Sequence, residues 1–326
     1  MLLSIIVPCY NEAAALPYFL AEIQKTGAEL REAFGCETEL LFIDDGSRDN
    51  TLSVLRSAAK TEPNVRYLSF SRNFGKESAM YAGLRHAKGD YVAIMDADLQ
   101  HPPAMLREMM EVLERGEAGE NGERGAVYDC AAARRVSRKG EPPLRSFFSR
   151  LFYRVLNRIS DTEIVEGACD FRVMRRRMVD AVLSLGEYNR FSKGIFSWVG
   201  FRTKWLPFEN VERVAGETKW SFRTLLLYSI QGIVGFSTVP LVMAAVLGVA
   251  LCGISLAIVA YIIVKTLLFG DPVKGWPTMA CMIMFLGGIQ LFSMGILGEY
   301  LAKTYLEVKR RPIYVLAESG GEDAAS

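Results

Sequence analysis

Two long stretches of this 326-residue chain contain no charged side chain, and they restrict its fold more than any other feature. Neither residues 224–264 nor residues 275–298 include a Lys, Arg, Asp or Glu. As a single helix the first stretch would be about 60 Å long, roughly twice the thickness of a bilayer's hydrocarbon core. It must therefore be divided, and Gly235 and Pro240 are the predicted breaks. At these lengths a buried soluble hairpin is a weaker alternative than membrane spans.

The divided stretches give three predicted helices. We expect an interfacial helix over Trp220–Phe236, a first membrane span over Val239–Phe269 and a second span over Thr278–Ala302. The basic residues that flank the spans are Arg213, Lys219 and Arg223 before them and Lys303, Lys309, Arg310 and Arg311 after them. By the positive-inside rule, this distribution predicts a two-span protein of the cell inner membrane, with both termini and the preceding domain in the cytoplasm.

The first half of the chain alternates short apolar runs with helical patterns. The predicted strands are Ser4–Val7, Glu39–Ile43, Val65–Phe70 and Tyr91–Met95, and the predicted helices are Ala14–Phe34, Thr51–Lys60, Glu77–Ala87 and Pro103–Arg115. Strands of continuous Val, Ile and Leu between helices are typical of a mostly parallel sheet that helices cover on both faces. We therefore predict an α/β, Rossmann-like sheet domain that precedes the two spans.

Polar motifs follow each of the four predicted strands. In chain order these motifs are Pro8–Glu12, Asp44–Ser47, Arg72–Lys76 and Asp96–Asp98. In a parallel sheet of this kind, ligands bind beyond the carboxyl ends of the strands. One polar strand end would mean little, because loops are polar in general, but four in succession predict a single lined cleft.

The fourth motif carries the most chemical information. The segment GDYVAIMDADLQHPP, residues 89–103, runs from a buried strand into two carboxylates that one residue separates. Such a pair can bind a divalent metal, act as acid and base, or cap the next helix. Two carboxylates this close repel each other unless a cation or a proton intervenes. Because Mg²⁺ and Mn²⁺ prefer oxygen ligands, we predict that Asp96, Asp98 and Gln100 bind one of these ions. His101 is predicted to make only a local polar contact.

A basic amphipathic helix is predicted between the sheet strands and the spans. Over Leu144–Ser160 apolar residues recur at helical spacing, and Arg150, Arg154 and Arg158 recur every four residues. Two interpretations remain open. The segment is either an ordinary surface helix that packs on the sheet domain or a helix that lies on an anionic membrane surface.

Several motifs in a fixed order resemble one enzyme family. The segments IIVPCYNE, IDDGSRD, SRNFGKE and DADLQHPP are together similar to glycosyltransferase family 2, whose members have the GT-A fold. The later segments EGACDFRVM, YNRFSKG and GETKWS, followed by two spans, resemble the polyprenyl-phosphate glycosyltransferase branch of that family. The resemblance extends from Ser4 to about Arg311. Each motif alone is weak, but their joint order is specific.

The resemblance implies roles for individual residues. The residues that it places at the nucleotide-sugar are Pro8, Tyr10, Asn11, Glu12, Asp44, Asp45, Lys76 and Asp96, and those that it places at a Mg²⁺ or Mn²⁺ ion on the diphosphate are Asp96, Asp98 and Gln100. The residues that it assigns to catalysis are Asp98 and Asp170, and those that it assigns to the acceptor phosphate are Arg134, Arg138, Arg213 and Lys219.

Two of these assignments have alternatives. Where the family typically has a short strand that ends in a Gly-x-Arg turn, this chain has VYDCAAARRVSRKGE, so either Arg134 or Arg135 is the equivalent residue. Asp170 could instead form only an ion pair with Arg172 or another neighbour. A phosphate monoester acceptor has a second pKa near 6 and is already a nucleophile at neutral pH. Because such an acceptor needs no strong base, we expect Asp170 to be an orienting or charge-stabilising group rather than an essential base.

The expected organisation has four parts: a cytoplasmic GT-A domain over residues 1–218, a juxtamembrane helix over 219–236, a two-helix transmembrane domain over 237–311 and a C-terminal tail over 312–326. The implied reaction is inverting transfer of a hexose from a nucleotide-sugar, glucose from UDP-glucose, to undecaprenyl phosphate for modification of cell-envelope glycans. Other donors remain open, namely GDP-mannose, UDP-GlcNAc or a UDP-linked formylated aminoarabinose. An inactive nucleotide-binding membrane scaffold is the alternative from another class.

Net charge and the glycines of the second span provide information on two kinds of partner, nucleic acids and further copies of this chain. The chain has 38 Lys and Arg against 37 Asp and Glu, so its net charge does not indicate a nucleic acid. In the second predicted span, Gly287, Gly288, Gly295 and Gly298 allow close approach of helices. Because the enzymes that these motifs resemble include tetramers, the resemblance implies a homo-oligomer, such as a tetramer.

Overall fold

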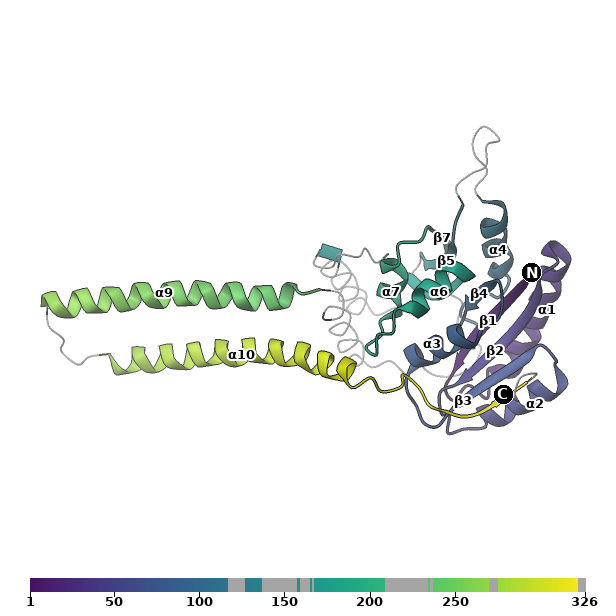
Figure 1. Cartoon of the computed structure of the whole chain (residues 1–326), viewed down its shortest axis with the longest axis horizontal. Coiled ribbons are helices and arrows are strands. Elements are labelled where there is room, and N and C mark those ends of the chain that lie inside the picture. Colours follow the sequence, from purple (N-terminus) through teal and green to yellow (C-terminus); the bar gives the residue numbers. More distant parts are fainter. Residues whose placement is uncertain are drawn as a thin grey trace, which may run out of the picture.

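Among the residues that this computed structural model describes, eight strands form one sheet (Figure 1). The described residues are 1–116, 127–136, 157–158, 165, 167–208, 234, 237–269 and 275–321. The strands are β1 Leu2–Cys9, β2 Glu37–Asp44, β3 Val65–Phe70, β4 Tyr91–Ile94, β5 Cys130–Arg135, β6 Ala168–Arg175, β7 Thr203–Phe208 and β8 Leu316–Gly320. Across the sheet their order is β7-β5-β6-β4-β1-β2-β3-β8.

The four N-terminal strands are neighbours and run parallel, in the order β4-β1-β2-β3. Their carboxyl ends therefore lie along one edge of the sheet, as the sequence predicted. Beyond them the sheet is mixed, because β6 is antiparallel to both β4 and β5, and β8 is antiparallel to β3. The predicted strands and helices of this half are confirmed, with small differences at their ends.

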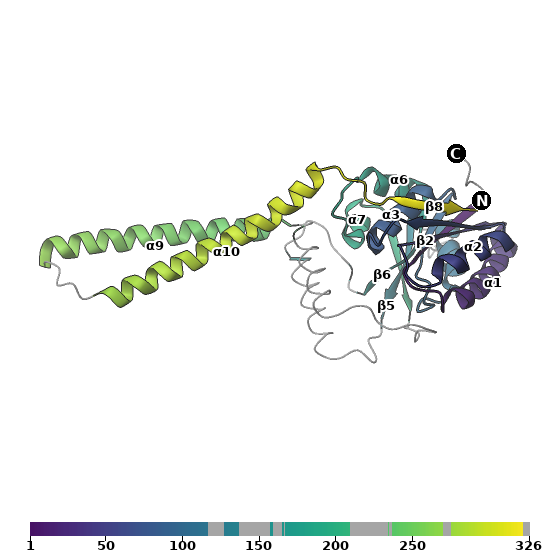
Figure 2. The same cartoon turned by 90° about the horizontal axis from the view of Figure 1, so that it is seen from below.

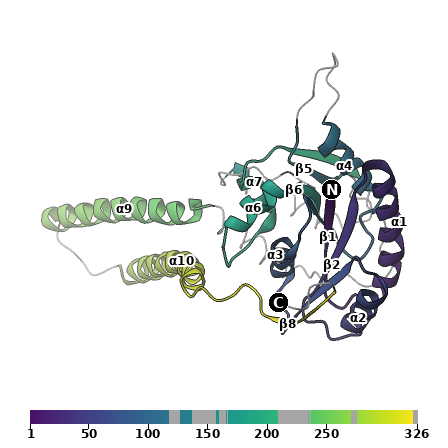
Figure 3. The ribbon, with the colours of Figure 1, turned by 45° about the vertical axis from the view of Figure 1, so that its right-hand side comes forward.

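Helices cover both faces of the sheet. Their bounds are α1 Leu16–Phe34, α2 Thr51–Thr61, α3 Lys76–His86, α4 Met105–Arg115, α6 Arg176–Ser184 and α7 Ser192–Trp198. In Figure 3, α1, α2 and α4 lie on one side of the sheet and α3, α6 and α7 on the other. Residues of the first three helices join one buried apolar cluster, and residues of the other three join a second cluster. Because both faces are buried, the central strands are apolar at successive positions rather than at alternate ones.

A hairpin of two long helices projects from the sheet domain (Figures 1 and 2). These helices are α9 Val239–Phe269 and α10 Trp276–Val308, which begin and end close to the predicted spans. Their exposed large apolar residues include Val242, Met243, Leu267, Phe269, Phe285, Leu291 and Phe292. Within the described ranges, one segment is long and apolar enough to cross a membrane, Phe285–Val308, and Val239–Leu251 is a shorter apolar helix. The existence of a second span therefore stays a prediction.

Two predicted helices fall almost wholly outside the described residues. Of the amphipathic segment Leu144–Ser160 the structure describes only residues 157–158, and of the interfacial segment Trp220–Phe236 it describes only residue 234. The two interpretations of the amphipathic segment therefore both stay open.

The C-terminal segment returns to the sheet, which the sequence did not predict. After α10, β8 pairs with β3 and covers an edge that would otherwise be open to other strands. The Glu318 carboxylate accepts hydrogen bonds from Nε and Nη2 of Arg56, at 2.8 and 2.6 Å. The ring of Tyr314 stacks on Phe70 with centroids 5.1 Å apart, and its hydroxyl lies 3.0 Å from Nε2 of His86. The chain end is thus fastened to the same domain as its beginning.

We expect Tyr314→Ala to lower the free energy of unfolding by about 2 kcal/mol, because it removes a half-buried ring and its stacking partner loses contact. Chemical unfolding of the purified full chain in detergent measures the change. Tyr18→Ala is the matched control, since Tyr18 is 59% exposed on α1. Equal losses in the two variants would contradict a stabilising role for the C-terminal return.

Candidate active site

Three charged side chains from three elements meet beyond the ends of the central strands. The Nζ atom of Lys76, the first residue of α3, lies 2.7 Å from Oδ1 of Asp96 and 2.8 Å from Oδ2 of Asp170. Asp96 follows β4, and Asp170 belongs to β6, which is the antiparallel neighbour of β4. The guanidinium of Arg172 donates to the main-chain carbonyls of Cys169 and Asp170. Three residues that were predicted separately therefore form one cluster, and Lys76 is the neighbour that pairs with Asp170.

The members of this cluster shift one another's pKa. Burial alone would raise the pKa of the Asp170 carboxyl, but Lys76, Lys193 and Arg172 hold it well below its usual value. Burial would lower the pKa of Lys76, but Asp170 and Asp96 raise it above its usual value. At neutral pH, Asp170 is therefore a carboxylate and Lys76 an ammonium. A general base works best with a pKa near the working pH, so Asp170 is better suited to orienting or stabilising charge.

Asp45 holds the backbone that leads to Lys76. Its carboxylate oxygens accept the amide N–H groups of Phe74 and Gly75, at 2.6 and 2.9 Å. Gly75 has φ +98°, a conformation that favours glycine. Burial raises the pKa of the Asp45 carboxyl to about 6, although both amide bonds oppose the shift. Asp45, predicted to contact the nucleotide-sugar, thus has a structural role in placing Lys76.

Other predicted residues hold neighbouring strand ends together. Asp44 is buried, and it accepts hydrogen bonds from the amide of Ser47 and the hydroxyl of Ser69. Asn11 has φ +55°; its amide donates to Ser47, and its side-chain oxygen accepts the Arg48 amide.

The β1 end also supplies Pro8, Tyr10 and Glu12. The amide of Glu12 donates to the hydroxyl of Thr51 at 2.9 Å. Pro8 lies opposite Ile43 of β2 in the sheet register. Tyr10 and Glu12 are half-buried. The ends of β1 and β2 therefore adjoin, as expected for a shared nucleotide site.

The sequence did not identify two charged residues near the cluster. Glu77 follows Lys76, and its carboxylate accepts hydrogen bonds from the amide and the hydroxyl of Ser192, the first residue of α7. The next residue, Lys193, contributes to the low pKa of Asp170. Lys193 and Ser192 belong to the motif YNRFSKG, which carried part of the family resemblance, so the motif was a signal but gave no residue roles.

The predicted metal ligands lie on the loop after β4. Asp96 and Asp98 are both half-buried, and Oδ1 of Asp98 accepts the amide of Gln100 at 3.2 Å. In the described part of the chain, no group of three or more His, Cys, Asp or Glu residues is arranged to hold a metal. Two carboxylates with hard oxygen donors nevertheless fit Mg²⁺ or Mn²⁺ when a substrate diphosphate supplies the remaining ligands.

His101 is buried and packs between aromatic rings. Its ring centroid lies 5.3 Å from those of Phe171 and Phe208. Neither ring nitrogen has a hydrogen-bond partner among the residues described. The predicted local polar contact is therefore not found there, because aromatic packing fills the surroundings.

Of the four basic residues predicted to bind the acceptor phosphate, the structure describes only Arg134; Arg138, Arg213 and Lys219 lie outside the described residues. β5 pairs residue for residue with β7, and its register against β6 shifts between Ala132 and Arg134. Arg134 is exposed and Arg135 half-buried. Which of the two is the equivalent of the family's arginine therefore stays open.

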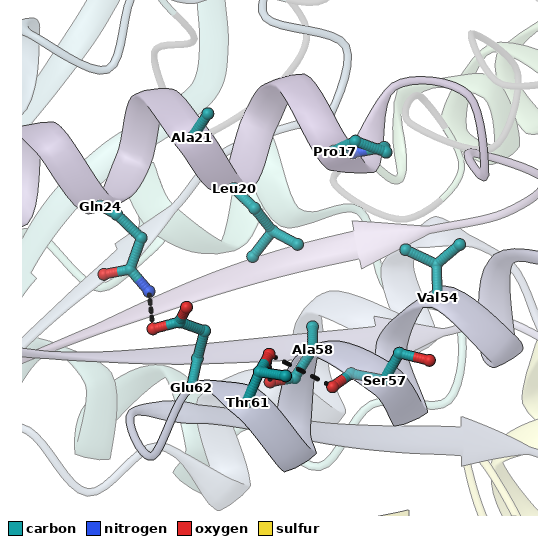
Figure 4. Close-up of a pocket in the computed structure, with 9 residues that line it drawn as sticks. All are labelled: Pro17, Leu20, Ala21, Gln24, Val54, Ser57, Ala58, Thr61 and Glu62. Atoms are coloured by element: carbon teal, nitrogen blue, oxygen red, sulfur yellow. Dashed lines mark hydrogen bonds between the residues drawn. The ribbon is translucent and has the colours of Figure 1, made fainter.

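An open depression lies away from this cluster, between α1 and α2 (Figure 4). It is lined mainly by apolar side chains such as Leu20 and Val54, and at one end Gln24 donates a hydrogen bond to Glu62. None of the predicted site residues lines it. The polar cluster at the strand ends is therefore the candidate active site.

Comparison with known proteins gives consistent matches along the chain. The model of the family Glycosyl transferase family 2 matches residues 4–183. The SfII prophage-derived bactoprenol glucosyl transferase of Shigella flexneri is 40% identical over 319 residues, which cover 98% of this chain and 98% of that protein. The prophage bactoprenol glucosyl transferase homolog of Escherichia coli strain K12 is 39% identical over 316 residues, which cover 97% of this chain and 98% of that protein.

Among solved structures, the mannosyltransferase PcManGT from Pyrobaculum calidifontis, in complex with GDP-Man and Mn²⁺, matches with a TM-score of 0.45 and 18% identity. The match covers 95% of this chain and 88% of that one.

The pKa of Asp45 gives a testable pH dependence. Because its pKa is about 6 in the folded chain and about 3.9 in an unfolded one, its contribution to stability is present below pH 4 and is lost as the pH rises through 6. Asp45→Asn removes this titration. From pH 4 to pH 7, the stability of the variant relative to the wild type should therefore rise by about 1–3 kcal/mol.

Chemical unfolding in detergent without substrate, at both pH values, measures this change. Asp180→Asn on α6 is the matched control, because it removes a negative charge from an exposed position. If the free energies of unfolding of Asp45→Asn and the wild type differ by the same amount at pH 4 and pH 7, the raised pKa of Asp45 is refuted.

Proposed function

The chain belongs to glycosyl transferase family 2, and we propose that it transfers glucose from UDP-glucose to a polyprenyl phosphate at the cytoplasmic face of a membrane. The observation that carries this proposal is the 40% identity, over nearly the whole length of both chains, to a protein named as a bactoprenol glucosyl transferase. The likeness extends over the sheet domain and the helical hairpin together. If the acceptor is a membrane lipid, the sheet domain carries out the transfer and the helical hairpin holds it at the membrane where the acceptor lies.

The geometry supports a donor site at the ends of β1, β2 and β4. The base and ribose are assigned to the adjoining ends of β1 and β2, where Asn11, Glu12 and Asp44 lie. The diphosphate is assigned to the loop of Asp96 and Asp98, with Lys76 beside it. Lys76 then has a positive charge within reach of the phosphate oxygens on which negative charge accumulates as UDP departs.

The acceptor requires little help to become a nucleophile. A phosphate monoester is largely dianionic at neutral pH, and its oxygen attacks the anomeric carbon from the side opposite the departing UDP. The carbon–oxygen bond to UDP breaks as the bond to the acceptor phosphate forms, so the product is an inverted, β-linked sugar phosphate. No proton has to be removed, which agrees with the low pKa of Asp170. Asp170 then orients Lys76 and stabilises positive charge that develops on the sugar.

Two anionic substrates must be held together, which requires positive charge on each. For the acceptor phosphate we assign Arg134 of β5, together with Arg138, Arg213 and Lys219. For the donor we assign Asp96, Asp98 and Gln100 to a bound Mg²⁺ or Mn²⁺. When bound, this ion neutralises the diphosphate and makes UDP a better leaving group.

The same proposal assigns α9 and α10 to two membrane spans. They contain 31 and 33 residues, enough to cross about 30 Å of hydrocarbon. β1 and β8 belong to one sheet, so a hairpin that crosses and returns leaves both termini on the side of the sheet domain. Lys309, Arg310 and Arg311 lie at that end of the hairpin, which favours the cytoplasmic side.

Purified full-length protein, with undecaprenyl phosphate, Mg²⁺ and radiolabelled UDP-glucose, should yield a radioactive product that extracts into chloroform, together with free UDP. GDP-mannose, UDP-GlcNAc and a UDP-linked formylated aminoarabinose, tested in parallel, should yield much less. A lipid product from one of these donors alone would overturn the choice of sugar. Absence of product with every donor would support the inactive scaffold instead.

We expect Asp98→Ala to lower kcat about a hundredfold or more, because it removes one of two carboxylates assigned to the metal on the diphosphate. A chelator should abolish transfer by the wild type, and added Mg²⁺ or Mn²⁺ should restore it. Asp180→Ala, a change at an exposed position of α6, serves as the control. Full activity of the Asp98 variant would contradict the proposed role of Asp98 as a metal ligand. It would not contradict the proposed glucosyl transfer.

A further inference from the structure

The last turn of α10 contacts the loop that precedes α7. The Glu307 carboxylate accepts hydrogen bonds from the amides of Tyr188 and Asn189, each at 3.0 Å, and from the side-chain amide of Asn189 at 3.1 Å. One turn earlier, Nζ of Lys303 lies 3.3 Å from Oδ1 of Asn189. A carboxylate that accepts several N–H groups forms strong, charge-assisted hydrogen bonds. The hairpin is therefore attached to the sheet domain at a defined point.

The contacted loop continues directly into the active site. Three residues after Asn189, the amide of Ser192 donates to Glu77 at 3.0 Å, and Glu77 adjoins Lys76. Between these points the guanidinium of Arg190 lies 4.6 Å from the centroid of the Tyr81 ring on α3. The segment from α10 to the Lys76 cluster is thus a continuous series of contacts.

Lys193 is the charged residue that follows this series of contacts, directly after Ser192. It follows Ser192 on α7, which packs against β6, the strand of Asp170. It is half-buried, and its charge acts on the carboxylate of Asp170. Besides Lys76, which lies between two carboxylates, Lys193 is a second cation whose charge acts at the reaction centre.

We propose that Glu307 is a positioning residue that holds the loop at Tyr188 and Asn189, and thereby keeps the start of α7, with Ser192 on Glu77 and Lys193 next to it, docked at the Lys76 cluster during transfer. The inference rests on the proposed glucosyl transfer for its kinetic readout. It assigns the cytoplasmic end of α10 a part in catalysis besides anchoring, because the active site has its full set of cations only when this end is docked.

Kinetics of the full chain in detergent with lipid test the role of Glu307. Glu307→Ala should lower kcat by between about tenfold and a hundredfold, because a displacement of about 1 Å at a reacting centre has effects of this size. KM for UDP-glucose should change little, since the residues assigned to its base and ribose, Asn11, Glu12 and Asp44, lie at the ends of β1 and β2. Glu307→Gln retains an acceptor oxygen and should recover most of the rate. Glu299→Ala, at an exposed position of the same helix, is the matched control.

A double-mutant cycle separates positioning from general damage. If Glu307 acts through Lys193, the variant with both Glu307→Ala and Lys193→Ala should be no slower than Lys193→Ala alone. Losses that multiply in the double variant would overturn the proposal. So would a rate for Glu307→Ala equal to that of the Glu299 control.

Amine labelling tests the position of Lys193 without relying on the reaction. An acylating reagent followed by mass spectrometry should modify Lys193 several times faster in Glu307→Ala than in the wild type, while exposed Lys25 serves as the internal reference. Unchanged labelling of Lys193 would overturn the positioning role. If the wild type transfers no sugar but the labelling changes as expected, the proposed function fails and the structural coupling stands.

Discussion

The ion pairs of Lys76 with Asp96 and Asp170 are the interaction on which the rest of the site depends. Asp96 and Asp170 come from neighbouring antiparallel strands, so the fold itself brings two carboxylates to one place. Two carboxylates without a cation between them would repel each other, and one would take up a proton. Lys76 prevents this by donating to both. Its place at the start of α3 depends in turn on Asp45, which binds the two preceding amides.

This balance also limits what the site can accept. In the ion pairs of Lys76, two carboxylates face one ammonium, and a nucleotide diphosphate and a phosphate monoester both add negative charge. Neutralising these substrates calls for further cations, and those that we propose are Lys193 on α7, Arg134 on β5 and a metal ion bound by Asp98. Cations that belong to different elements can each be placed against a different anionic group of the two substrates. This arrangement therefore lets one site neutralise both substrates.

The sequence predicted correctly those elements that depend on interactions between residues close together in the chain. Apolar runs that end in polar residues located β1 to β4, and the parallel order of their ends followed from the alternation with helices. The contact of Lys76 with Asp170 spans 94 positions and depends on β6 running antiparallel beside β4, for which no local pattern exists. β8 was missed for a similar reason: LAESG is half exposed and short, and only its partner β3 makes it a strand. Lys193 stood in a recognised motif, but its role becomes visible only when α7 is placed against β6.

The connection between hairpin and sheet has a mechanical consequence. Residues 309–315 separate the end of α10 from the start of β8, and a link of this length reaches at most about 25 Å when fully extended. β8 is paired with β3, and Tyr314 is stacked on Phe70. The link could become longer only if β8 separated from β3 and these contacts were lost. If α10 crosses a membrane, the strand ends must then stay near its surface. A polyprenyl phosphate is held at that same surface by its hydrocarbon chain. The tether and the lipid therefore confine both partners to one thin layer, which raises their effective concentration without any additional contact between them.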